Sequence, residues 1–158
     1  MKDFKNKVVV ITGAGSGIGR ALAAAWAAQG AKLALNDYNA ASLQQTIAQL
    51  PPPTDVFESV FDVSHRAHME QFAEAVMHRF GRVDVVVNNA GIGLGDYPFA
   101  EIDLNHFEQV MDINFYGVLY GSRAFVPHLL KQPEAALVNI SSVFGLTGIA
   151  LSSAYCAS

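Results

Sequence analysis

The chain has 158 residues, of which 51% are hydrophobic and 15% are charged, and its formal net charge is −4. These values predict one globular domain with a real core and exclude an intrinsically disordered chain. An acidic balance without a basic run argues against a nucleic-acid partner, and no apolar run has the length of a membrane span or a secretory signal. The single cysteine, Cys156, excludes an internal disulfide and fits a reducing compartment, so we expect a cytoplasmic protein.

The first element is the most informative stretch of the chain. Residues 8–19 read Val-Val-Val-Ile-Thr-Gly-Ala-Gly-Ser-Gly-Ile-Gly, and a helical pattern follows over residues 20–29. A buried strand, a glycine loop and a helix in this order present free backbone N–H groups to a phosphate. We therefore expect a dinucleotide whose pyrophosphate is bound by Gly13, Gly15, Ser16, Gly17, Ile18 and Gly19.

The rest of the chain alternates between strand and helix patterns. Short apolar runs predict strands over 32–36, 56–61, 83–87 and 136–140, and helical spacing predicts helices over 40–50, 65–80 and 104–131. Ser64 is the expected cap of the helix over 65–80, and the helix over 104–131 is expected to bend or end near Pro127. The alternation indicates an α/β architecture, in which helices cover both faces of an open parallel sheet.

An aspartate follows the second strand. Asp37 lies 24 positions after Gly13, near the spacing at which a carboxylate accepts hydrogen bonds from the adenosine ribose. The same carboxylate would repel the 2′-phosphate of NADP, and Ser16, Tyr38 and Asn39 supply no basic group to bind it. The pattern therefore predicts NAD over NADP, whereas a solvated turn aspartate is the alternative without function.

Four motifs in series resemble those of the short-chain dehydrogenase/reductase (SDR) family. They are Thr-Gly-x3-Gly-x-Gly from Thr12, Asn-Asn-Ala-Gly from Asn88, Asn-Ile-Ser-Ser from Asn139, and Tyr155 placed 13 positions after Ser142. The resemblance covers the whole length of the chain. It implies a single NAD(P)-binding domain over residues 1–158, with a Rossmann-type doubly wound parallel sheet of strand order 3-2-1-4-5. It also implies an NAD-dependent oxidoreductase that interconverts a secondary alcohol and a ketone.

The resemblance implies roles for residues outside the glycine loop. Asp62 and Val63 match the pair that borders the adenine, and Asn89 matches an asparagine that holds the central strand and lies along the cofactor. Asn114 matches a helix asparagine that anchors a proton-relay water. Each match has an alternative without function. Asp62 and Val63 would form a strand-end turn, and Asn89 would be an amide that caps a loop. Asn114 would be a helix amide that needs a hydrogen bond wherever it is buried.

Ser142 and Tyr155 match the reacting pair of the family. The resemblance implies that the tyrosine is the acid or base and that the serine polarises the substrate oxygen; a phenol can exchange this proton only if its anion is stabilised. In the family, a lysine four residues after the tyrosine does this, and the sequence ends at Ser158, one position earlier. We therefore expect a C-terminally incomplete domain with an exposed fifth strand, Tyr155 on an unfixed terminus, and negligible turnover.

Other residues carry weaker signals. His65 and His68 share a helix face without a third ligand, so no metal site is expected. Cys156 has no basic neighbour and is interpreted as a filler position. Gly117 and Gly121 indicate close packing of the long helix, either on the sheet or on a partner helix. By resemblance, the complete protein is expected to be a homodimer or homotetramer.

Other functions stay open at this point. A dinucleotide-binding module without chemistry and an NADP-dependent carbonyl reductase of the same fold both fit the first motifs. A methyltransferase would have its own glycine loop but would not account for the later motifs. The substrate stays unidentified, and the segment 92–103, with Gly93, Gly95, Tyr97 and Phe99, is expected to supply one wall of its pocket.

Overall fold

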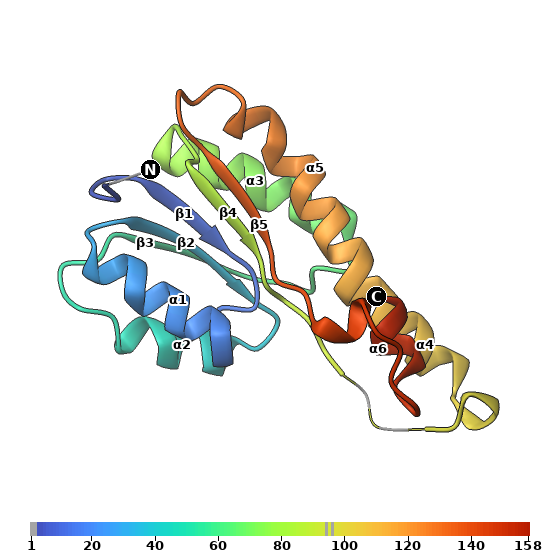
Figure 1. Ribbon diagram of the computed structural model, residues 1–158. Coiled ribbons are helices and arrows are strands. Elements are labelled where there is room, and N and C mark those ends of the chain that lie inside the picture. The colour runs from blue at the N-terminus through green and yellow to red at the C-terminus, as the bar shows by residue number, and fades with distance from the viewer. Residues whose placement is uncertain (1–2, 94, 96) are drawn as a thin grey trace.

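The computed structural model describes residues 3–93, 95 and 97–158, so positions 94 and 96 of the 92–103 segment lie outside the described residues. A parallel five-stranded sheet of order β3-β2-β1-β4-β5 forms the centre of the described part (Figure 1). The strands are β1 (Val8–Ile11), β2 (Lys32–Asp37), β3 (Val56–Val60), β4 (Val85–Asn88) and β5 (Ala136–Asn139). The α/β fold class and the expected strand order are confirmed.

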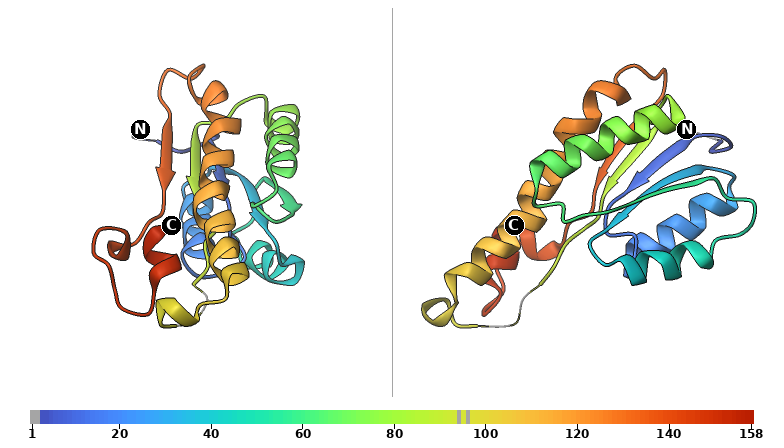
Figure 2. Two further views of the ribbon diagram at one scale, coloured as in Figure 1. Left: turned by 90° about the vertical axis from the view of Figure 1, so that its right-hand side faces the viewer. Right: turned by 180° about the vertical axis from the view of Figure 1, so that it is seen from behind.

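Helices lie on both faces of this sheet (Figures 1 and 2). They are α1 (Gly17–Ala28), α2 (Ala40–Ala48), α3 (Arg66–Phe80), α4 (Leu104–Met111), α5 (Gly117–Leu129) and α6 (Ser153–Ala157). The pair α1 and α2 covers one face, and α3 and α5 cover the other, as the view from behind in Figure 2 shows. Within the described ranges, no helix combines the length and apolar character needed to cross a membrane.

The central strand β1 is buried on both faces because its side chains alternate between two cores. Val8 and Val10 pack in the same cluster as Phe72, on the side of α3 and α5. Val9 and Ile11 pack with the alanines of α1 on the other side. A β-branched run without alternation is the pattern expected for such a doubly covered parallel strand. Packing on both faces fixes the position of β1 and of its carboxyl end, where the glycine loop begins.

The helix expected over 104–131 is divided by a π-helical turn, Asp112–Tyr116, between α4 and α5. Pro127 lies in the last turn of α5, which ends at Leu129, so the helix ends near Pro127 as expected, but the pattern does not indicate the earlier interruption. This interruption falls at Asn114, whose side chain is bonded to the backbone of Ile92. Gly117 and Gly121 face the sheet side: a Cβ on Gly117 would lie 2.8 Å from the Val63 side chain, and one on Gly121 would collide with Asn88 Oδ1. The contact of Gly121 is with a residue of β4 and fits the interpretation as helix-on-sheet packing, whereas Gly117 packs on the turn after β3.

The cap of α3 differs from the expectation by one residue. His65 is the N-cap residue and makes no side-chain capping bond. Ser64 lies in the preceding turn, where its N–H donates to Asp62 Oδ1 at 2.9 Å and its hydroxyl lies 3.0 Å from His65 Nδ1. Because Ser64 takes part in the turn at Asp62, the helix begins one residue later than expected.

Two expectations for the last third of the chain have different outcomes. β5 pairs with β4 alone in the described sheet and its residues are exposed, as expected. The prediction of an unfixed terminus for Tyr155 is wrong, because Tyr155 lies within α6, and α6 packs against α4. The Cys156 N–H donates to the Ser152 carbonyl at 2.9 Å and holds this short helix.

Candidate active site

A tight loop joins β1 to α1 at the carboxyl edge of the sheet. Gly13 has a φ of +64°, which favours glycine, and a Cβ there would lie 2.8 Å from the Cα of Ala90. A Cβ on Gly19 would collide with the Gly13 carbonyl oxygen. These glycines therefore let the loop, the first turn of α1 and the chain after β4 approach one another closely.

Thr12 and Asn89 hold this loop against the end of β4. Thr12 Oγ1 accepts the N–H groups of Asn89 and Ala90 at 3.0 and 3.1 Å. Asn89 Nδ2 donates in return to the carbonyls of Thr12 and Gly13, at 2.9 and 3.1 Å. The loop thus presents the N-terminus of α1, where Ser16 is exposed and makes no side-chain capping bond. Unpaired N–H groups and the positive end of a helix dipole suit an anion.

Asp37, the last residue of β2, lies beneath the glycine loop and is only 6% exposed. Its Oδ2 accepts the Gly15 N–H at 2.8 Å, and its Oδ1 accepts the Asn39 N–H at 2.9 Å. A Cβ on Gly15 would lie 2.8 Å from this carboxyl group, so the position needs glycine. Each carboxylate oxygen can accept a further hydrogen bond, which leaves acceptor capacity for ribose hydroxyls.

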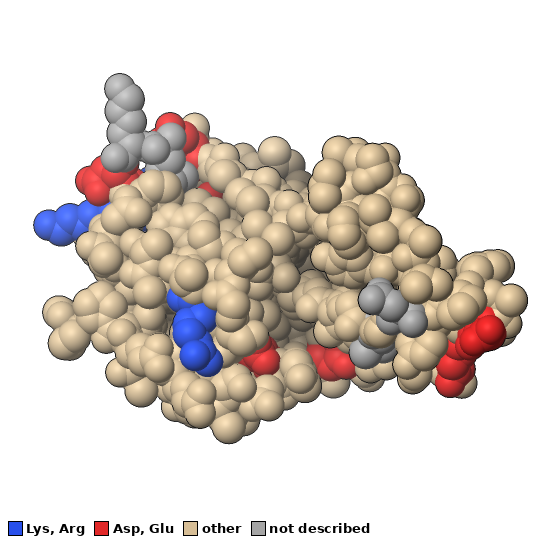
Figure 3. All heavy atoms as spheres, turned by 60° about the horizontal axis from the view of Figure 1, so that its bottom comes forward, with Lys and Arg blue, Asp and Glu red and all other residues tan. Residues whose placement is uncertain are grey.

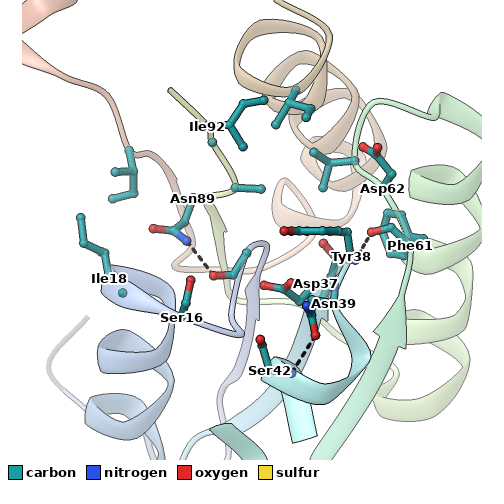
Figure 4. A pocket seen from close by; sticks show the side chains of 18 of the residues that line it. Ser16, Ile18, Asp37, Tyr38, Asn39, Ser42, Phe61, Asp62, Asn89 and Ile92 are labelled. Carbon is teal, nitrogen blue, oxygen red and sulfur yellow. Dashed lines mark hydrogen bonds between the residues drawn. The ribbon is translucent and has the colours of Figure 1, made fainter. Parts of the chain in front are cut away.

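A cleft of about 680 Å³ opens above these groups (Figures 3 and 4), a size within the range of small-molecule sites. In Figure 4, Ser16 and Ile18 lie on one side and Tyr38, Phe61 and Asp62 on the other. The predicted cofactor residues that line it are Gly13, Ser16, Gly17, Ile18, Asp37, Asp62, Val63 and Asn89. Gly15 and Gly19 do not line it; they allow the close contacts behind it. Among the described lining residues there is no Lys or Arg.

Sequence reasoning missed two aromatic residues of this cleft. The sequence pattern identifies Tyr38 only as a residue that is not basic and Phe61 only as the end of a strand, yet both line the cleft. Tyr38 is 75% exposed, and Phe61 is partly buried next to Asp62. Their positions directly beside Asp37 and Asp62 were the available signal. Aromatic faces at this end of the cleft suit a flat ring such as adenine.

The predicted reacting pair lies at a second cavity, also of about 680 Å³. Ser142 and Tyr155 both line this cavity, and Tyr155 lines the first cleft as well. Ser142 Oγ accepts the Phe144 N–H at 3.2 Å, and the ring of Phe144 meets that of Tyr155 edge to face at 6.2 Å between centroids. The structure therefore brings Ser142 and Tyr155 to one cavity that adjoins the glycine-loop cleft.

Asn114 also lines the second cavity, from the π-helical turn. Its Oδ1 accepts the Ile92 N–H at 2.8 Å, and its Nδ2 donates to the Ile92 carbonyl and to Ser158 Oγ, both at 2.9 Å. The side chain thus fixes the segment after β4 and the end of α6. These contacts account for a half-buried helix amide without a relay, and the proton-relay role stays a prediction.

The remaining singled-out residues have local partners. The rings of His65 and His68 stack at 5.2 Å between centroids. Nowhere in the described ranges do three His, Cys, Asp or Glu side chains gather as a metal site. Cys156 Sγ accepts the Ile149 N–H at 3.4 Å and so ties α6 to the loop before it.

The sequence is similar to known oxidoreductases over nearly its whole length. A sequence model of the family described as short chain dehydrogenase matches residues 7–158. The "Putative oxidoreductase SadH" of Mycobacterium tuberculosis is 41% identical over 159 residues, covering 98% of this chain and 56% of that protein. The levodione reductase of Leifsonia aquatica is 38% identical over 157 residues, covering 98% and 59% respectively. The chain thus spans a little more than half the length of these relatives.

Solved structures show the same similarity in three dimensions. A short chain dehydrogenase/reductase from Burkholderia phymatum, in complex with NAD, has a TM-score of 0.94 and 40% identity, over 99% of this chain and 56% of that one. Levodione reductase has a TM-score of 0.93 and 39% identity, over 98% and 61%. NAD⁺-bound xylitol dehydrogenase has a TM-score of 0.92 and 30% identity, over 98% and 60%.

Proposed function

The chain belongs to the short-chain dehydrogenase family, and we propose that the whole protein containing it interconverts a secondary alcohol and a ketone with NAD as its cofactor. One observation carries the proposal. The cleft built on the glycine loop and Asp37 shares Tyr155 with the cavity of Ser142. A cofactor bound in the first and a substrate bound in the second would meet at the phenol.

The residues of the cleft fit a dinucleotide. The N-terminus of α1 and the free hydroxyl of Ser16 would bind the pyrophosphate. Asp37 would accept hydrogen bonds from the adenosine ribose, and its charge would repel a 2′-phosphate. The described lining holds no Lys or Arg to compensate that repulsion. These features support NAD over NADP.

NAD bound there would supply the acceptor for the hydride that leaves the alcohol carbon. Tyr155 Oη would take the hydroxyl proton during oxidation and return it during reduction. Ser142 Oγ accepts the Phe144 N–H, so its own O–H hydrogen is left to donate to the substrate oxygen. That bond would orient the oxygen and stabilise the charge it develops.

A phenol works as a proton acceptor where a neighbouring positive group stabilises its anion. The family pattern puts a lysine one position beyond Ser158, and Asn114 Nδ2 already contacts Ser158 Oγ at 2.9 Å. The codon that follows Ser158 in the gene distinguishes two functions. A lysine codon supports the enzyme, and a stop codon supports a module that binds dinucleotides without chemistry.

A matched pair of tyrosine variants tests the proposed acid or base in the whole protein. Tyr155→Phe should lower kcat by about 1000-fold, the range of general acid–base catalysis, with the Kd for NAD unchanged within about twofold. Tyr116→Phe is the control, because Tyr116 lies in the π turn and lines neither cavity. A Tyr155→Phe variant that turns over as fast as the control would contradict the assignment.

A further inference from the structure

The cavity of Ser142 and Tyr155 is uncharged over the described residues. Its lining includes no Asp, Glu, Lys, Arg or His. The polar side chains among its lining residues are amide, hydroxyl and thiol groups, of which Asn114, Ser142 and Cys156 already bond to the backbone. Among these residues an anionic substrate would find no cation to replace its hydration.

The wall next to this cavity is apolar and exposed. Val143 and Leu146 line the cavity, and their side chains are 64% and 87% exposed. Ile149 and Leu151, further along the same loop, are 43% and 48% exposed. Figure 3 views the hollowed face of the molecule, and on the half that carries α4 and α6 the described residues show no Lys or Arg atoms. Exposed apolar side chains beside a cavity commonly mark a binding surface.

A second segment extends this wall. The Tyr97 N–H donates to the Leu151 carbonyl at 2.9 Å, which joins the 97–99 segment to the 143–151 loop. Tyr97 and Phe99 are 41% and 75% exposed. We call the residues Tyr97, Phe99, Val143, Leu146, Ile149 and Leu151 the apolar wall. Two of its members, Val143 and Leu146, line the cavity of Tyr155.

We propose that the substrate is a neutral secondary alcohol or ketone whose other carbons are hydrocarbon, and that the apolar wall binds them. This inference rests on the proposed function. Along the apolar wall, the Tyr97 hydroxyl is the one side-chain group that can bond the hydroxyl groups of a polyol or sugar, and each hydroxyl left unpaired weakens binding. A carboxylate or phosphate would meet no positive side chain among the described lining residues. A hydrocarbon group instead gains free energy in proportion to the apolar area it covers.

The rest of the whole protein is the competing occupant of the apolar wall. Two observations favour the substrate. Val143 and Leu146 line the same cavity as Ser142 and Tyr155, so a ligand at the reacting pair touches them. The cavity volume of about 680 Å³ also fits a small molecule.

A substrate panel with NAD and the whole protein tests the proposal. It contains cyclohexanol and menthol as neutral apolar alcohols, myo-inositol and xylitol as polyols, and lactate as a carboxylate. We expect kcat/KM for the best apolar alcohol to exceed those of the polyols and lactate by about 100-fold. If a polyol or lactate is the fastest substrate, or if NAD binds and no apolar alcohol reacts, the inference is overturned. Failure to bind NAD would overturn the proposed function itself.

A pair of leucine variants tests the wall directly. Leu146→Asp should raise the KM for the apolar alcohol by about tenfold, while the Kd for NAD and the unfolding midpoint stay unchanged. Leu130→Asp is the control, because Leu130 is 80% exposed at the end of α5 and lines neither cavity. A lower unfolding midpoint for Leu146→Asp alone would show that the rest of the protein covers the wall. That result would overturn the inference.

Discussion

The backbone N–H of Gly15 donates a hydrogen bond of 2.8 Å to the carboxylate of Asp37. The bond joins the glycine loop after β1 to the end of β2, across 22 positions of the chain. The side chain proposed to select the ribose therefore also holds the loop proposed to bind the pyrophosphate. A change at Asp37 should therefore weaken the binding of both the adenosine ribose and the pyrophosphate.

Asp37→Ala should weaken NAD binding by about 10- to 100-fold, since a hydrogen bond to a charged group contributes about 1.5–3 kcal/mol. It should also reduce the preference for NAD over NADP, because the repulsion of the 2′-phosphate is lost. Asp37→Asn is the matched variant: it keeps an oxygen for the Gly15 N–H and removes the charge. Equilibrium titration with both cofactors measures the two effects. Unchanged affinities in both variants would remove Asp37 from the site.

Gly121→Ala should lower the free energy of unfolding by about 1–3 kcal/mol, the usual cost of overpacking. The added Cβ would collide with Asn88 Oδ1, which is buried without a hydrogen-bond partner. Asn88 has little freedom to move, because its Nδ2 donates to Asn139 Oδ1 at 2.9 Å and to Ser122 Oγ at 3.1 Å.

Gly148→Ala is the control for this change. Gly148 has no heavy atom within 4 Å of its ideal Cβ and no positive φ. Urea unfolding should show its midpoint unchanged or slightly raised. Equal midpoints for Gly121→Ala and wild type would contradict the close packing of α5 on β4.

The parts of the fold that the sequence predicts are local ones. The Val-Val-Val-Ile run, the glycines after it and the helical spacing after those lie within residues 8–29, and the structure has this strand, loop and helix. The strand order is not a local property, and it followed from the resemblance to a family. The position of Asp37 at the end of β2 followed from strand length and spacing.

The features that the sequence could not predict depend on residues far apart in the chain. The π turn forms where Asn114 meets Ile92, 22 positions away, and nothing in the 104–131 pattern signals it. The bridge between Asn88 and Asn139 spans 51 positions. Motif matching identified these asparagines, but only the folded chain shows which carbonyls and amides they bind.

Asp84→Asn should lower the free energy of unfolding by about 2–4 kcal/mol at about pH 7, because it breaks a buried ion pair. The Asp84 side chain is fully buried, and it accepts from Arg82 at 2.5 and 2.9 Å, from the Val8 N–H at 2.9 Å and from Lys7 at 3.4 Å. Burial alone would raise the pKa of Asp84, but the hydrogen bonds from Arg82 and the Val8 N–H, with the charge of Lys7, hold it below its usual value.

The sign of the pH dependence follows from this lowered pKa. The charged carboxylate stabilises the fold fully above its ordinary pKa of about 4, and this contribution is lost as the pH falls through the folded-state pKa. The difference between wild type and Asp84→Asn should therefore shrink below about pH 4. Asp55→Asn is the control, because Asp55 is a partly exposed ion-pair partner of Arg79, and such pairs contribute about 0–1 kcal/mol. A pH-independent difference for Asp84→Asn would contradict the assignment.

Calorimetric titration of the whole protein with NAD and then with NADP tests the central claim most directly. The cleft above the glycine loop predicts saturable heat from NAD and a Kd at least about tenfold larger for NADP. Folded protein that gives no heat with either cofactor, or that binds NADP more tightly, would contradict the account.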